Sequence, residues 1–315
     1  MQKLFKKIVA LFAGAMLIET PVPAPVHVTP APTPEPPAIV DAASDRDVFS
    51  GLRFKLDAKV LHIWFPNIKN ADEAVLVCGD EVFLIDCGDK RAALSGAELL
   101  KKLGITKIDK LFNSHPHHDH LRGLSWTNDA AAVQELLVCF PHDSTPTMIE
   151  VMGYAAAKKI PVIDYADGDT FTMGGGEITL TFRCNNDPNL DMNNNSSVTL
   201  VKHGERSILF AADVEEPGME ALLQRVPAAD LKADFIKYPH HGHPALTDAF
   251  KAAVSPAAAI VTNINVDWTG LKYLRQKKIP VYLTCEGDTV LHLYTDGQTW
   301  VIERLPLSQV QPLQD

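Results

Sequence analysis

The amino-acid sequence predicts a globular protein of the α/β class. Short apolar runs typical of buried strands, at residues 82–87 and 110–112, flank an amphipathic stretch typical of a helix at residues 90–103. Polar side chains lie at the end of the first strand and directly after the second. In open α/β sheets the functional residues usually lie at the carboxyl ends of the strands. The composition agrees, because 46% hydrophobic and 22% charged residues in a chain of 315 supply enough apolar material for one large core or two small ones.

The remaining elements are predicted from apolar periodicity and turn signals. Further helices are expected over residues 127–136, 146–159 and 271–276. Further strands are expected over residues 60–64, 74–78, 137–140, 161–165, 178–183, 197–202, 207–212, 233–238, 258–264, 280–284, 290–294 and 300–303.

The amino-terminal segment predicts export. Three lysines precede an apolar run at residues 8–18, which is shorter than the about 20 residues that span a bilayer but suits a signal-peptide core. We therefore expect a signal peptide over residues 1–20, with a retained membrane anchor as the alternative. Residues 21–45 carry eight prolines and predict an extended linker. The folded domain is expected over residues 46–315.

Net charge and cysteine usage limit the function further. A formal net charge of -10 excludes attraction of polyanions by the field of the whole protein, so a nucleic-acid substrate would be held by local contacts. The five cysteines include no Cys-x-x-Cys pair, and Cys78 and Cys87 lie too far apart on their predicted hairpin for a disulfide. We expect five buried thiols.

Residues 113–120, Asn-Ser-His-Pro-His-His-Asp-His, carry the strongest chemical signal in the chain. A transition-metal site needs three or four N or O ligands about 2.0–2.2 Å from the ion. His115, His117, Asp119 and His120 could supply such ligands from an irregular loop directly after a strand, and imidazole with carboxylate suits Zn, Mn or Fe. A solvated polar loop is the alternative, and so many ligand-type side chains in one short segment argue against it.

Other candidate residues also stand at strand ends. Asp86 and Asp213 each follow an apolar run, and either could be a turn residue only. The segment 239–243, Pro-His-His-Gly-His, follows a third such run, and we expect at least one of its histidines to bind metal.

The segment 115–120 resembles the His-x-His-x-Asp-His signature of metallo-β-lactamase fold hydrolases, and the other strand ends match its partner motifs. This resemblance implies a four-layer αββα fold, two divalent metal ions (Zn or Mn), and hydrolysis by a metal-activated water, with Asp119 and Asp213 as catalytic residues. It implies that Asp86 supports the loop at residues 113–120, which we call the metal loop. It also implies that Asp213 bridges the two ions. The implied metal ligands are His115, His117, Asp119, His120, Asp213 and His240, with His241 as the alternative to His240.

Within this fold family the chain is most similar to the hydrolase domain of the DNA-uptake competence proteins often called ComEC or Rec2, and to their stand-alone exported relatives. The shared motifs are Ser-His-Pro-His-x-Asp-His, Asn-Ser-Ser-Val, Lys-Tyr-Pro-His-His-Gly and Val-Tyr-Leu-Thr, and they cover roughly residues 55–305. The resemblance implies a secreted phosphodiesterase or nuclease acting on a small-molecule or polymer ester, DNA included. No stable protein partner is expected. A membrane tether is expected only if the predicted signal peptide at residues 1–20 is not cleaved.

The sequence departs from the family pattern between the metal loop and the bridging aspartate. Residues 193–197, Asn-Asn-Asn-Ser-Ser, stand where true metallo-β-lactamases carry a third histidine for the first ion. Site one would then have two histidines and Asp213, completed by water or by an Asn oxygen such as that of Asn195. Fewer imidazoles and more oxygen shift the preference from Zn towards Mn.

Two further positions depart from the pattern. Arg122 stands where the family usually has Gly, and His243 where relatives often have Ser; together with His241 they are candidates for substrate contacts. An alternative function is a lactonase or β-lactamase that cleaves C–O or C–N bonds, which the missing third histidine disfavours. A third reading is a metal-binding module without catalysis. The acidic net charge weakens the nuclease reading.

Overall fold

The computed structural model describes residues 39–41, 60–263, 265 and 267–313. The predicted signal peptide or anchor at residues 1–20, most of the linker, and all of residues 46–59 lie outside this part. The end of the expected linker, Ile39–Asp41, forms strand β1 and pairs in parallel with β18 (Trp300–Pro306). The last linker proline is Pro37, so the following residues can donate backbone hydrogen bonds. None of the described helices combines the length and apolarity that a bilayer crossing requires.

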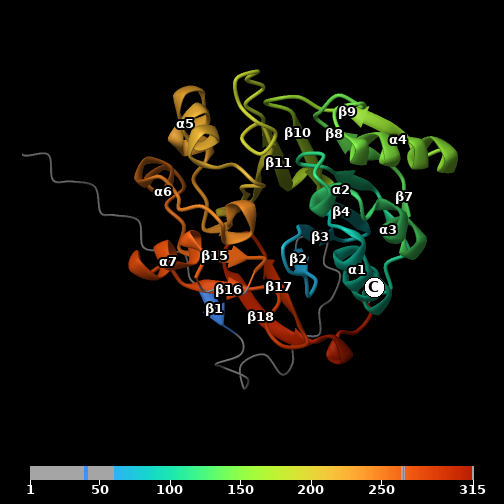
Figure 1. Ribbon diagram of the computed structural model, residues 1–315. Coiled ribbons are helices and arrows are strands. Elements are labelled where there is room, and N and C mark those ends of the chain that lie inside the picture. Colours follow the sequence, from blue (N-terminus) through green and yellow to red (C-terminus); the bar gives the residue numbers. More distant parts are fainter. Residues whose placement is uncertain (1–38, 42–59, 264, 266, 314–315) are drawn as a thin grey trace, which may run out of the picture. The chain divides into compact units, whose positions relative to one another are not determined.

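The first sheet has nine described strands in the order β1-β18-β17-β2-β3-β4-β6-β8-β9 (Figure 1). Helices α1, α3 and α4 cover its outer face, where apolar side chains of the helices and strands form one buried cluster. The elements are β2 (Leu61–Phe65), β3 (Glu73–Cys78), β4 (Glu81–Cys87), β6 (Lys110–Phe112), β8 (Leu136–Val138), β9 (Val162–Asp164), β17 (Thr289–Thr295), α1 (Lys90–Leu103), α2 (His118–Leu121), α3 (Leu124–Ala130) and α4 (Pro146–Lys158).

The second sheet has seven described strands in the order β10-β11-β12-β13-β14-β15-β16, and helices α5, α6 and α7 lie on its outer face (Figure 1). A small pairing of β5 with β7 lies apart from both sheets. The elements are β5 (Lys107–Ile108), β7 (Ala132–Val133), β10 (Thr170–Met173), β11 (Ile178–Arg183), β12 (Val198–His203), β13 (Arg206–Phe210), β14 (Phe235–Lys237), β15 (Ala258–Val261), β16 (Val281–Leu283), α5 (Glu216–Arg225), α6 (Asp248–Val254) and α7 (Thr269–Gln276).

The two sheets pack face to face over a shared apolar core. Alternate residues of β2, such as Ile63 and Phe65, meet Phe182 of β11 and Phe210 of β13 in this core. Each sheet is therefore covered by the other sheet on its inner face and by helices on its outer face. This arrangement confirms the expected four-layer αββα fold.

Most predicted elements are present, and one is wrong over half its length. The helix expected over 127–136 is α3, which begins three residues earlier at Leu124 and ends at Ala130. The chain then leaves the helix because Asn128 Oδ1 accepts a hydrogen bond from the backbone N–H of Val133 (3.0 Å), and β7 pairs with β5. Helices α5 and α6 were not predicted.

The start of α1 lies beside the metal loop. Asp89 caps this helix by accepting hydrogen bonds from Arg91 N (2.8 Å) and Ala92 N (2.9 Å). At the end of the metal loop, Gly123 N donates to Gly88 O (2.8 Å). A side chain at Gly123 would place its Cβ 1.9 Å from the carbonyl oxygen of Cys87, so only glycine allows this close approach.

Candidate metal centre

The candidate residues gather at matching edges of the two sheets. Strands β4 and β6 are parallel neighbours, so Asp86 near the end of β4 and the metal loop after β6 emerge at one edge. Strands β13 and β14 are also parallel neighbours, and they deliver Asp213 and the segment 239–243 in the same way. The predicted ligands therefore meet although they are far apart in sequence.

A first cluster consists of His115, His117 and Asp213, each offering one atom within 4.8 Å of the others. His115 Nε2 lies 3.0 Å from His117 Nδ1 and 3.6 Å from Asp213 Oδ2. Two ligand atoms that are each about 2.1 Å from an ion at a tetrahedral angle are roughly 3.4 Å apart. The spacing in this first cluster fits a shared ion.

A second cluster consists of His120, Asp213 and His241, which together with Asp72 offer ligand atoms within 4.8 Å of one another, and Asp119 adjoins it through His241. His241 Nε2 lies 3.3 Å from Asp119 Oδ2 and 3.9 Å from Asp213 Oδ2, and His120 Nε2 lies 3.2 Å from Asp213 Oδ1. Within the described residues, His120 Nε2 and Asp213 Oδ1 are buried, and apart from their contact with each other neither has a polar partner. Buried polar atoms with so few partners are costly, and a divalent ion would satisfy both of them.

Outer carboxylates orient the two histidines of the second cluster. Asp86 Oδ2 lies 2.8 Å from His120 Nδ1, and Asp72 Oδ1 lies 3.0 Å from His241 Nδ1. An ionised carboxylate only accepts hydrogen bonds, so each Nδ1 carries the proton and each Nε2 is left to bind metal. The role implied for Asp86 thus agrees with its contacts, because it also accepts hydrogen bonds from Ser114 N (2.8 Å) and Ser114 Oγ (2.7 Å).

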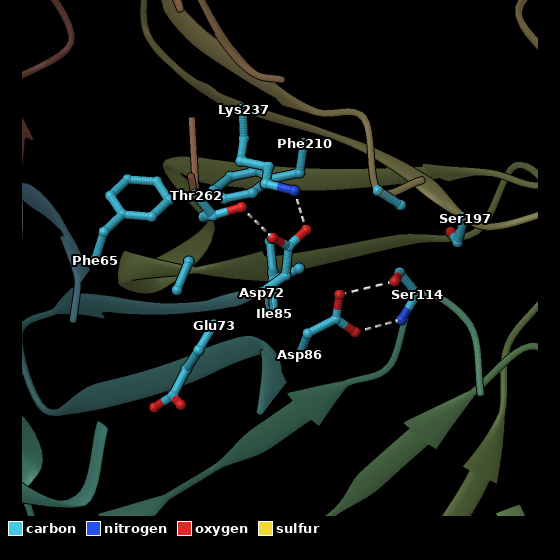
Figure 2. A pocket seen from close by; sticks show the side chains of 12 residues that line it. Phe65, Asp72, Glu73, Ile85, Asp86, Ser114, Ser197, Phe210, Lys237 and Thr262 are labelled. Atoms are coloured by element: carbon cyan, nitrogen blue, oxygen red, sulfur yellow. Dashed lines mark hydrogen bonds and ion pairs between the residues drawn. The ribbon is translucent and has the colours of Figure 1, made fainter. Parts of the chain in front are cut away.

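Sequence reasoning missed Asp72 and its partner Lys237. Asp72 shares the buried space between the sheets with Lys237 and Thr262, and Figure 2 shows both contacting its carboxylate. The three groups line a small cavity of about 10 Å³, room for about one water molecule. Asp72 lies in a loop with no strong motif, so a signal could have come only from Lys237, a charged residue inside an apolar strand.

The structure brings His241, rather than His240, into the second cluster. His240 Nδ1 lies 2.7 Å from Glu215 Oε1, and its Nε2 is 3.8 Å from Asp213 Oδ2. His240 and His241 have φ values of 46° and 53° and so adopt left-handed backbone conformations. These conformations turn the neighbouring side chains to different sides, which is why the geometry differs from the preference for His240 and favours the alternative.

The electrostatics of the centre favour positive charge. Burial opposes the charge of His241, yet the carboxylates of Asp72 and Asp213 raise its pKa to about 9. Burial also opposes the charge of His120, and Asp213 and Asp86 raise its pKa well above the usual value. For His115, burial and the charge of His120 hold the pKa well below its usual value, so this imidazole is neutral. Carboxylates that attract protons this strongly also attract a cation, which would replace those protons.

The run of asparagines shapes a loop and contributes less directly to the centre than expected. Asn195 Nδ2 donates to the carbonyls of Asp187 and Leu190 (2.9 Å each), and not to either cluster within the described residues. Asn194 Oδ1 accepts from Glu215 N (3.0 Å) and so anchors the partner of His240. The run contacts the bridging position through Ser196, whose Oγ accepts from the backbone N–H of Asp213 (3.3 Å).

The two other expected substrate contacts lie in different settings. Arg122 is exposed and forms an ion pair with Glu150 (3.4 Å), so it is a surface residue. His243 is exposed, lies beside His240 with ring centroids 5.2 Å apart, and contacts the Trp268 ring at 5.1 Å. Glu215, His240 and His243 form a third group with metal-ligand spacing.

The chain matches the family model of the metallo-beta-lactamase superfamily over residues 74–262, more than half of its length. The chain therefore belongs to the metallo-β-lactamase superfamily, a class of metal-dependent hydrolases, as its motifs predicted. No curated protein sequence matches it.

Solved structures with a similar fold are distant in sequence. The metallo-beta-lactamase fold protein YhfI from Bacillus subtilis is 13% identical, with 74% of this chain and 99% of that chain covered and a TM-score of 0.47. MEM-A1, a subclass B3 metallo-beta-lactamase from a soil metagenome, is 15% identical, with 59% and 78% covered and a TM-score of 0.40. A Cronobacter sakazakii metallo-beta-lactamase is 17% identical, with 58% and 75% covered and a TM-score of 0.38.

Proposed function

We propose that the chain is a phosphodiesterase that uses two divalent metal ions, Zn or Mn, held by the first and second clusters. The observation that carries this proposal is the orientation of Asp213. Its Oδ1 lies 3.2 Å from His120 Nε2 in the second cluster, and its Oδ2 lies 3.6 Å from His115 Nε2 in the first. A carboxylate whose oxygens face two sites can hold two ions about 3.5–4 Å apart, the spacing found in phosphatases and nucleases.

The ions, when bound, supply Lewis-acid polarisation of the scissile bond and a water whose pKa is lowered to about 7. Asp119 has a side chain that is 20% exposed, whereas that of Asp213 is 2% exposed. Asp119 therefore reaches the open side of the centre, where its carboxylate can accept a hydrogen bond from the attacking water. Burial opposes its charge, but His241 and His120 keep the pKa of Asp119 below its usual value.

His240 is the side chain best positioned to contact the leaving group. Glu215 holds its Nδ1, which fixes the ring, and the side chain is 27% exposed beside Asp213. A ring held in this way keeps its Nδ1 proton on Glu215, so its Nε2 accepts a hydrogen bond when the ring is neutral and donates one to a substrate oxygen only as imidazolium. His241 is buried and oriented by Asp72, so it does not compete for this role.

The composition of the first cluster supports a phosphodiester over a β-lactam. It contains two imidazoles and one carboxylate, and residues 193–197 add no imidazole. An oxygen-rich site accepts Mn as well as Zn. The ComEC-type motifs support the same substrate class, and the apolar run at residues 8–18 supports export. Detection of the full-length, unprocessed protein only in the cytosol would contradict export.

The proposed activity is tested with the purified full-length chain. Bound metal is measured by mass spectrometry, and hydrolysis of bis(p-nitrophenyl) phosphate, a β-lactam and a lactone is compared with added Mn or Zn. We expect phosphodiester hydrolysis that is lost in His115→Ala and Asp119→Ala. Turnover that survives both substitutions, or a protein that binds no metal, would overturn the mechanism. Preferential hydrolysis of the lactam or the lactone would replace the substrate class, and bound metal with no turnover would indicate a binding module.

A further inference from the structure

A third set of ligand-type side chains lies beside the metal centre and belongs to neither cluster. It consists of Glu215, His240 and His243, which offer ligand atoms within 4.8 Å of one another. We call these three residues the rim group. His240 Nε2 lies 3.8 Å from Asp213 Oδ2, which places the group next to the centre. The side chains of Glu215 and His240 are 34% and 27% exposed, so an ion can reach them from solvent.

Backbone contacts hold the three residues of the rim group in place. Asn194 Oδ1 accepts a hydrogen bond from Glu215 N (3.0 Å). His240 N donates to Ala212 O (2.9 Å), and His243 N donates to His240 O (2.8 Å). The spacing of the three side chains therefore follows from the fold itself.

The side chains of the rim group are little engaged elsewhere in the described part of the chain. Glu215 stands at the start of α5, but its carboxylate does not cap the helix. Its one ion pair is with His240, where Oε1 lies 2.7 Å from Nδ1. The His243 ring packs edge-on against the ring of Trp268, with centroids 5.1 Å apart, and makes no hydrogen bond. The lone pairs of His243 are therefore available to a ligand.

The composition of the rim group suits one class of ion. Two imidazoles and one carboxylate bind zinc and leave a fourth position open to water, which makes the ion exchangeable. Imidazole ligands favour zinc, nickel or copper over manganese. The exposed pair of His142 and Asp164 shows the contrast, because no third ligand-type side chain among the described residues completes it.

We propose that the rim group binds a third, exchangeable divalent ion of the zinc type, which moves the ring hydrogen of His240 to Nε2. Nδ1 of His240 faces Glu215, whereas Nε2 faces Asp213. An ion shared with Glu215 takes the Nδ1 lone pair, so the neutral ring carries its hydrogen on Nε2. Two ligand atoms of one ion are roughly 3.4 Å apart, so a small movement of Glu215 makes room for it.

The third ion would change what His240 offers to a substrate. Without it, the neutral ring accepts a hydrogen bond at Nε2; with it, the neutral ring donates one to a substrate oxygen. This effect on turnover rests on the proposed phosphodiesterase function, whereas the ion site does not.

The ion site is tested by counting zinc. The full-length chain is dialysed against buffered free zinc, and bound zinc is measured by mass spectrometry. Wild type should bind about one zinc per chain more than His243→Ala or Glu215→Gln, which keep all residues of both clusters. The zinc that these variants retain shows that they are folded. Dialysis against manganese should give no such difference.

A matched variant controls for the loss of an exposed histidine. His142→Ala removes the histidine of the pair with Asp164 and should bind as much zinc as wild type. Equal zinc in wild type and both rim variants would overturn the site. So would an equal loss of zinc in His142→Ala.

The position of the ring hydrogen is tested by two-bond ¹H–¹⁵N spectra, with the His240 signals identified from their loss in His240→Gln. We expect the hydrogen on Nδ1 at low free zinc and on Nε2 once the additional zinc is bound. A hydrogen that stays on Nδ1 would overturn coordination through that atom.

Turnover of bis(p-nitrophenyl) phosphate separates this inference from the proposed function. Zinc that fills the rim group should raise turnover about tenfold in wild type and not in His243→Ala. An equal effect of zinc on both proteins would overturn the role given to His240. If wild type binds the additional zinc but hydrolyses no phosphodiester, the proposed function fails and the ion site stands. If it hydrolyses the ester without binding additional zinc, the ion site fails and the function stands.

Discussion

The two ligand clusters share Asp213 but differ in what supports their histidines. In the second cluster, His120 and His241 are each held from behind by a carboxylate, at 2.8 Å and 3.0 Å. In the first cluster, His115 Nδ1 lies near a hydroxyl, Ser114 Oγ, at 3.1 Å, and His117 is only partly buried. Carboxylate support fixes the ring and raises its basicity. We therefore expect the second cluster to bind metal more tightly than the first.

Removing the shared ligand should have the largest effect. Asp213→Ala takes an oxygen from both clusters, so we expect loss of all tightly bound metal and a fall in activity of roughly three orders of magnitude. Metal content and phosphodiester turnover measure this. His117→Ala provides the comparison, because it should empty only the first cluster. If Asp213→Ala lowered metal content no more than His117→Ala, the carboxylate would not be shared.

Removing the outer support should affect the second cluster selectively. Asp72→Asn removes the carboxylate behind His241, and we expect metal affinity at that cluster to fall by about 10–100-fold. Combination with Lys237→Met avoids leaving the ammonium of Lys237 buried without a charged partner. Titration against a chromogenic chelator resolves the tighter and the weaker site.

An exposed carboxylate–histidine pair offers the control for this substitution. Asp164 Oδ1 lies 2.8 Å from His142 Nε2, and both side chains are exposed. Asp164→Asn should leave both metal affinities unchanged. Should Asp72→Asn weaken the first cluster as much as the second, the difference in support between them would be refuted.

The residue next to Asp72 shows what a buried carboxylate does without partners. In the described part of the chain neither oxygen of Glu73 has a hydrogen-bond partner, and Figure 2 shows its side chain pointing away from the dashed contacts of Asp72 and Asp86. Burial raises the pKa of Glu73 from 4.5 to about 8. Asp72 is equally buried, yet Lys237 and His241 hold its pKa below the usual value.

A pH dependence of stability follows from the raised pKa of Glu73. Between about pH 4.5 and 8 the unfolded chain releases this proton while the folded chain keeps it, so stability falls as pH rises. Glu73→Gln removes that decline and should raise the free energy of unfolding at pH 7 by at most about 3 kcal/mol relative to wild type. Denaturant unfolding at pH 5 and pH 7 measures it. An equal difference between the proteins at both pH values would contradict the assignment.

The smallest effect is expected at Arg122. Its ion pair with Glu150 is exposed, and such pairs contribute about 0–1 kcal/mol. Arg122→Ala should change the KM for bis(p-nitrophenyl) phosphate by less than about twofold. A large rise in KM would show that Arg122 contacts the substrate.

Local patterns predicted the framework well. Helix α1 (Lys90–Leu103) and strand β6 (Lys110–Phe112) coincide with their predicted ranges, because a capping Asp89, a stop at Gly104 and apolar periodicity act within a few residues. The helix expected over 127–136 was wrong in its second half, where pairing of β7 with β5 prevails over helical periodicity. Contacts distant in sequence decide such cases, and a window of neighbouring residues does not contain them.

The sequence by itself determined the αββα class and the candidate ligands of one loop, His115, His117, Asp119 and His120, because consecutive residues after one strand stay together in any fold that buries that strand. Only the tertiary structure decided that His241, rather than His240, contacts Asp119, and that Asp72 stands behind His241. The first depends on two left-handed backbone conformations after β14, and the second on a contact between residues 169 positions apart. Periodicity and motif spacing report neither, because both arise where the two sheets meet.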